Sequence, residues 1–145
     1  AAAALERAAD LSPDPEPKAL RLIGAATAAW NAGQPGRAEG LLGRVSTAAP
    51  GLNAAANDLR GVIEWRCGSV PDACETLTRA AADIALLDPQ RAAQVFSDAG
   101  LACWDAGAYE QLGRVGRAAA ELLQQKLAPS ADEQSSMERE APKVP

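Results

Sequence analysis

The sequence contains no histidine and very few aromatic residues. Histidine is the commonest general base near neutral pH and a frequent metal ligand, so its absence argues against many acid–base and metal-dependent enzymes. The sequence also lacks the Gly-x4-Gly-Lys-Ser/Thr loop that cradles nucleotide phosphates and the Gly-x-Ser-x-Gly turn of many hydrolases. We therefore expect a protein that is not an enzyme and that needs no metal and no other cofactor.

Two further absences concern membranes and nucleic acids. No run of about 18 apolar residues is present, so no membrane-spanning helix is predicted. Lys and Arg do not gather in clusters, and the net charge is −5. Because phosphate binding needs a clustered excess of basic residues, we expect no nucleic acid to bind this chain. The chain also opens without the pattern of a secretion signal, which favours a cytoplasmic protein.

Alanine supplies most of the hydrophobic content, which amounts to 48% of the residues. Alanine is the best helix former and allows helices to approach closely, so the composition predicts an all-α protein. An excess of Arg over Lys together with abundant Ala is typical of proteins from GC-rich bacterial genomes.

Three segments share one frame: Trp30-Asn-Ala-Gly33, Trp65-Arg-Cys-Gly68 and Trp104-Asp-Ala-Gly107. Apolar residues at helical spacing precede each glycine, and a second such stretch follows it, so each frame predicts a helix, a tight turn and a helix. The helix after the first glycine is expected to run to about Ala48, where Pro50 ends it.

Seven helices are thus predicted within residues 1–127. The turns between them are expected near Pro13, Gly33, Pro50, Gly68, Pro89 and Gly107. The first eleven residues match the second helix of an earlier pair, and we expect the sequence to be a piece of a longer protein. Without its partner helix, the apolar face of Ala1, Leu5, Ala8 and Ala9 would be uncovered, which predicts weak self-association.

The frame Gly-x4-Ala-x3-Leu-x2-Val-x4-Pro, met by Gly33, Ala38, Leu42, Val45 and Pro50, resembles the tetratricopeptide repeat consensus. This resemblance implies a superhelical stack of antiparallel helix pairs, with about three pairs and a leading half-repeat over residues 1–128. Residues 129–145 are polar, and we expect them to form either a short helix or a linker.

The stretches 6–15 and 87–99 look like the helical-repeat middle of large ATP-binding LuxR-type transcriptional regulators. In that family an NTPase domain precedes the repeats, a helix-turn-helix domain follows them, and the repeats are thought to sense an inducer or a protein partner. The resemblance implies a bacterial segment for protein–protein interaction and signal relay. The alternatives are a domain that senses a small-molecule inducer and a purely structural helical spacer.

The three cysteines, Cys67, Cys74 and Cys103, are predicted to be reduced thiols that fill small spaces in the core. Cys67 occupies the frame position of Ala32 and Ala106, which favours a small buried side chain there. Three thiols at this spacing, with no fourth ligand, do not predict a metal site.

The tryptophans are the residues that could carry binding. They fall late in the first helix of each pair, where they could either anchor a partner in the concave groove or fill a core that is otherwise mostly alanine. If they line the groove, their neighbours do so too. The candidate binding residues for a protein or peptide are then Trp30, Asn31, Val62, Trp65, Arg66, Leu101, Trp104 and Asp105.

Overall fold

The computed structural model describes residues 1–127 and contains seven α-helices and no strand in that range. The helices are α1 (Ala2–Asp10), α2 (Pro15–Asn31), α3 (Pro35–Leu42), α4 (Pro50–Cys67), α5 (Val70–Ala85), α6 (Pro89–Asp105) and α7 (Tyr109–Leu127). The all-α prediction with seven helices is confirmed here, and the six predicted turns lie at the junctions between helices. The predicted polar tail, 129–145, lies outside the described residues.

Local sequence signals account for most helix ends. Proline occupies the first turn of α2 to α6, where its φ suits the helix and its missing N–H is not needed. At the start of α6 the Asp88 carboxylate accepts hydrogen bonds from two backbone N–H groups. Gly33 and Gly107 follow α2 and α6 with φ of 70° and 68°, a left-handed conformation that glycine adopts most readily.

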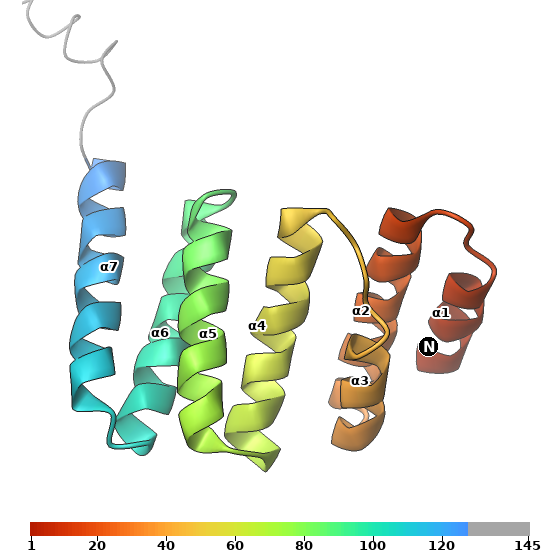
Figure 1. Cartoon of the computed structure of the whole chain (residues 1–145), viewed down its shortest axis with the longest axis horizontal. Helices are drawn as coiled ribbons and strands as arrows, with labels where there is room; N and C mark the ends of the chain where they lie inside the picture. Colours follow the sequence, from red (N-terminus) through yellow and green to blue (C-terminus); the bar gives the residue numbers. More distant parts are fainter. Residues whose placement is uncertain (128–145) are drawn as a thin grey trace, which may run out of the picture.

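Helices that follow one another in the chain pack side by side, except that α3 and α4 touch over a smaller surface (Figure 1). Helices two apart also touch, namely α2 with α4, α4 with α6 and α5 with α7. The even-numbered helices are therefore neighbours in one row, and α6 lies behind α5 and α7 in Figure 1. Among residues 1–127 no helix is long and apolar enough to cross a bilayer.

α3 is shorter than the sequence predicts. It ends at Leu42, whereas the prediction placed its end near Ala48. Gly40 and Gly43 weaken the helix here, because glycine is the poorest helix former after proline. Arg60 of α4 donates a hydrogen bond to the Leu42 carbonyl at 3.4 Å, so a contact from the next helix satisfies one of the terminal carbonyls.

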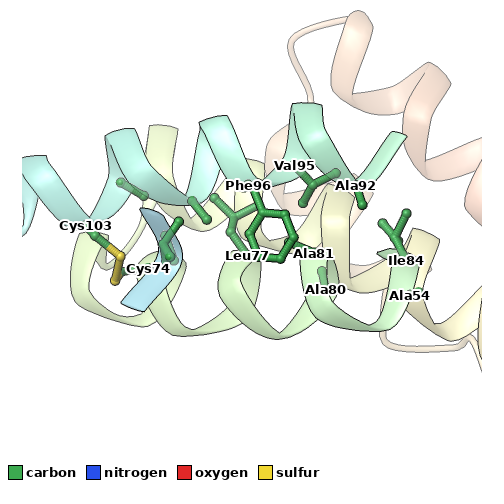
Figure 2. Close-up of a cluster of buried hydrophobic side chains, with 14 residues drawn as sticks. Ala54, Cys74, Leu77, Ala80, Ala81, Ile84, Ala92, Val95, Phe96 and Cys103 are labelled. Atoms are coloured by element: carbon green, nitrogen blue, oxygen red, sulfur yellow. A yellow bond between two sulfur atoms is a disulfide. The ribbon is translucent and has the colours of Figure 1, made fainter. Parts of the chain in front are cut away.

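The buried side chains form two clusters that meet on α4. The N-terminal cluster contains Ala9, Leu22, Ala25, Ala26, Ala29, Ala38, Leu41, Leu42, Ala56 and Ile63. The C-terminal cluster contains Ala54, Ala73, Cys74, Leu77, Ala80, Ala81, Ile84, Ala92, Val95, Phe96, Ala99, Ala102, Cys103 and Val115 (Figure 2). Because α4 contributes to both clusters, it connects the two halves of the protein.

The prediction of reduced, buried cysteines is wrong in two respects. Cys74 of α5 and Cys103 of α6 form a disulfide within the C-terminal cluster (Figure 2). Cys67 is exposed at the end of α4. The repeat frame aligns equivalent residues of different pairs and carries no information about which residues of adjacent pairs face each other. With 29 residues between its ends, the disulfide contributes about 3–4 kcal/mol by restricting the unfolded chain.

At the N-terminal end, α1 packs on α2 through the buried Ala9 and the partly buried Leu5. Glu6 of α1 forms ion pairs with Arg37 of α3 at 3.0 Å and with Arg44 at 2.7 Å. Two residues of the predicted uncovered face, Leu5 and Ala9, thus contribute to the N-terminal cluster. The weak self-association that we expected from this end stays a prediction.

α4 and α5 approach closely at Gly61. A Cβ atom at this position would lie 2.6 Å from Cγ of Leu77 and 3.3 Å from its backbone nitrogen. A distance below about 3 Å would require the Leu77 side chain to move away. The backbone nitrogen of Leu77 lies close behind that side chain. Gly61 therefore allows α4 to rest directly on α5.

Gly61→Ala should lower the free energy of unfolding by about 1–3 kcal/mol, because the added methyl group overpacks the α4–α5 contact. Gly40→Ala is the matched control, since its Cβ would meet open space within α3. That change should raise stability by up to about 1 kcal/mol through helix propensity. Urea denaturation followed by circular dichroism measures both values, and a Gly61→Ala protein as stable as the parent would contradict the close approach.

Candidate functional site

The predicted binding residues lie in the last turns of the even-numbered helices. Trp30 and Asn31 end α2; Val62, Trp65 and Arg66 lie near the end of α4; and Leu101, Trp104 and Asp105 lie near the end of α6. Because α2 touches α4 and α4 touches α6, these ends follow one another along the row. We call the last six of these residues the α4/α6 face.

Trp65 links α4 to α6. Its indole Nε1–H donates a hydrogen bond to Oδ2 of Asp105 over 2.8 Å. The guanidinium carbon of Arg66 lies 4.6 Å from the centroid of the Trp65 ring, a cation–π distance. The indole also packs against the C-terminal cluster and stays partly exposed. Trp65 therefore serves in part as a core residue, and its role as a binding anchor stays a prediction.

Trp104 is the open member of the series. Its exposed fraction is 62%, and its ring meets that of Tyr109 edge-on with the centroids 5.9 Å apart. Leu101, one turn earlier, is 54% exposed. An exposed aromatic pair beside an exposed leucine is the kind of apolar surface that marks interaction sites. Tyr109 was not predicted from the sequence, because the equivalent positions after Gly33 and Gly68 are Pro35 and Val70 and give no aromatic signal.

Trp30 has a different environment. It is partly buried and packs against the N-terminal cluster, so it serves mainly as a core residue of the first half. Asn31 is exposed beside it. Trp65 contacts both Arg66 and Asp105, whereas Trp30 packs against the other cluster.

Two aspartates near this face were also missed. Asp58 of α4 pairs with Arg91 of α6, with its Oδ2 2.9 Å from the guanidinium nitrogen. Partial burial raises the pKa of Asp98 above the ordinary 3.8, and the negative charge of Asp58 raises it further. A hydrogen bond from Gln94 and the charge of Arg66 lower that pKa in part.

The sequence holds a signal for both aspartates. Asp58 precedes Trp65 by seven residues, and Asp98 precedes Asp105 by seven residues. This two-turn spacing places each pair on one side of its helix. This spacing relates them to the predicted residues, while their interaction depends on the contact between α4 and α6.

Two of the open clefts lie between helices, away from the residues of the α4/α6 face. One, of about 480 Å³, lies between the starts of α2 and α4 and is mainly apolar; it is lined by Glu16, Pro17, Leu20, Ala49, Gly51 and Leu52. The other, of about 420 Å³, lies between α5 and α7; it is lined by Pro71, Cys74, Glu75, Ala108, Gln111 and Arg114. We call the second cleft the α5/α7 cleft. Its wall includes Cys74, one of the two disulfide-bonded cysteines.

The chemistry available at the α4/α6 face is recognition by apolar contact and hydrogen bonding. Within residues 1–127 no three acidic or cysteine side chains are grouped so as to hold a metal ion. Comparison of the chain with protein-family models, with curated proteins and with solved structures gives no match. The tetratricopeptide and LuxR-type resemblances therefore stay predictions.

Trp65→Phe and Asp105→Ala should each destabilise the protein by about 0.5–1.5 kcal/mol beyond any loss of packing, because each removes one partner of the hydrogen bond. In the double variant the two costs should not add, and the coupling energy measures the bond itself. Trp104→Phe is the matched control, with an expected change within about 0.5 kcal/mol. Strictly additive costs in urea denaturation would contradict a Trp65–Asp105 contact.

Asp98→Asn should make the protein more stable at pH 7. The pKa of Asp98 is higher in the folded than in the unfolded chain, so the folded state holds this proton more tightly. Ionisation above that pKa therefore costs stability, and the cost disappears as the pH falls to 3.8 and below. Unfolding midpoints over this pH range should show the advantage of the variant shrinking. An equal gain from Asp83→Asn, which is exposed on α5, would instead indicate a general effect of net charge.

Proposed function

We propose that this chain is a protein–protein interaction and signal-relay segment of a bacterial transcriptional regulator of the LuxR type. In this proposal α2 to α7 are three tetratricopeptide-like antiparallel helix pairs in a superhelical stack, and α1 is the second helix of an earlier pair. The even-numbered helices then line the concave surface. The segment is not an enzyme and acts by binding.

The exposed end of α6 is the observation that carries this proposal. Leu101, Trp104 and Tyr109 are all more than half exposed, although large apolar side chains usually gain stability from burial. Next to them, the carboxylate of Asp105 is held by the Trp65 indole, and Arg66 supplies a positive charge. An apolar centre with a polar rim is the usual composition of a protein-binding surface.

A protein or peptide partner suits this surface better than a small inducer does. The two clefts described above are open to solvent, and no tryptophan lines either of them. The apolar cleft between α2 and α4 has a volume within the range of small-molecule sites, which is the observation that supports the inducer alternative. A purely structural spacer would have no need for an exposed Trp104.

We further propose a cytoplasmic location, as the LuxR-type resemblance implies. The Cys74–Cys103 disulfide restricts this proposal, because cytosolic disulfides are usually transient and redox-sensing. A stable structural disulfide would instead fit an oxidising compartment. The cellular location of the protein and the redox behaviour of the disulfide are therefore linked.

Peptides selected from a random display library against this protein should lose affinity when the α6 end is altered. Leu101→Glu and Trp104→Ala should each weaken binding at least about tenfold, equivalent to about 1.4 kcal/mol. Calorimetry or fluorescence anisotropy measures this change. Both residues are exposed, so neither substitution should unfold the protein.

Leu123→Glu on α7 is the matched control, because Leu123 is 52% exposed and lies on a different helix. Its affinity for the selected peptides should equal that of the parent. Peptides that bind the Leu101→Glu and Leu123→Glu proteins equally well would place the interaction elsewhere. Selection of no peptide, combined with binding of a small apolar compound between α2 and α4, would favour the inducer alternative.

A further inference from the structure

The disulfide adjoins the α4/α6 face through α6. Cys103 precedes Asp105 by two residues in the last turns of α6, and Asp105 accepts the hydrogen bond from Trp65. Cys74 lies in the second turn of α5. The covalent bond therefore ties the end of α6 to α5 and holds Asp105 opposite Trp65.

The two ends of the disulfide differ slightly in burial. Cys74 is 3% exposed and forms part of the wall of the α5/α7 cleft, whereas Cys103 is completely buried. The volume of about 420 Å³ is sufficient for a small organic thiol. Glu75, Gln111 and Arg114 give the cleft a polar and charged rim, which suits a thiol that carries charged groups of its own.

We propose that the Cys74–Cys103 disulfide is a reversible thiol–disulfide exchange site, that it takes a small hydrophilic thiol through the α5/α7 cleft, and that its opening loosens the end of α6. The proposal does not depend on a protein partner, because both the exchange and the loosening occur within the chain itself. It adds a site of covalent modification to the binding surface described above.

The exchange follows the ordinary chemistry of thiolates. The small thiolate attacks Sγ of Cys74, the S–S bond breaks, and the sulfur of Cys103 leaves with the bonding electrons and takes a proton from water. A second small thiolate then attacks the outer sulfur of the mixed disulfide and releases Cys74, which is protonated in turn. Two thiols are oxidised to one small disulfide, and the protein disulfide gains two electrons. Oxidised small disulfide reverses both steps.

Opening the bond removes the covalent part of the α5–α6 contact. The C-terminal cluster around it is rich in alanine, and such small side chains give few contacts to replace the link. The end of α6 then depends on this packing and on the Trp65–Asp105 hydrogen bond. We therefore expect the indole N–H of Trp65 to exchange its hydrogen with water faster in the reduced protein.

The test uses the Cys67→Ser protein, because the exposed Cys67 could otherwise form disulfides between molecules. After mild oxidation, mass-spectrometric peptide mapping should identify the Cys74–Cys103 pair. Reduced glutathione without denaturant should give a mixed disulfide at Cys74 and then the dithiol, and oxidised glutathione should restore the bond. The Trp65 indole resonance, assigned with Trp65→Phe, should show hydrogen exchange on the order of tenfold faster after reduction, as local opening becomes easier.

A pair of variants tests the entry route. Gln111→Trp adds bulk at the α5/α7 cleft and should slow the reaction with glutathione severalfold. Gln124→Trp adds the same bulk at an exposed position further along α7 and should leave the rate unchanged. Equal rates for the two variants would overturn entry through the cleft.

Two other results would overturn the rest of the proposal. Free thiols at Cys74 and Cys103 after mild oxidation, or a disulfide that is reduced only in denaturant, would exclude a reversible exchange site. A disulfide that opens in the folded protein while the Trp65 resonance stays unchanged would exclude the coupling to α6. Because no readout uses a partner, a failure here is distinct from a failure of the proposed binding function.

Discussion

Close contact between helices is the constraint on which this fold depends, because so many of its buried side chains are alanine. An alanine removes little apolar surface from water, so the helices gain stability only if their backbones approach each other nearly to contact. At Gly61, α4 and α5 are so close that one added methyl group would collide with Leu77. The few large buried residues, such as Leu22, Ile63 and Leu77, fill the spaces that alanine leaves. Polar contacts are accordingly found at helix ends and on the surface.

The positions of the helices could be predicted because their determinants are local. Helical spacing of apolar residues, proline in the first turn and glycine after the last turn all act within a few residues of the chain. The end of α3 has a local cause in Gly40 and Gly43 and a non-local one, because an arginine of α4 satisfies the Leu42 carbonyl. The disulfide escaped prediction because its cause is also non-local, since Cys74 and Cys103 belong to different helices and meet only through the packing of α5 on α6.

The positions of the candidate binding residues within their helices could be predicted, whereas their surroundings could not. Three tryptophans occupy one frame position, yet each has different neighbours in space. Trp30 packs into the N-terminal cluster, Trp65 bonds to the next even-numbered helix, and Trp104 lies open beside Tyr109. The repeat frame fixes where each tryptophan lies in its own helix. How deeply its side chain is buried depends on the neighbouring helix. For the same reason, the repeat frame did not indicate Asp58 and Asp98. The charge of Asp58 on α4 affects the pKa of Asp98 on α6 because these two helices are adjacent.

The two clusters are held by different kinds of bond besides apolar packing. Around the N-terminal cluster, Glu6 of α1 is paired with Arg37 and Arg44, and such exposed ion pairs weaken as ionic strength rises. The C-terminal cluster carries the disulfide, which salt does not affect and thiols can open. Redox conditions therefore act on the C-terminal half, whereas salt weakens ion pairs in both halves, since Asp58 of α4 pairs with Arg91 of α6. Unfolding followed by a single spectroscopic probe would merge two responses that have separate physical origins.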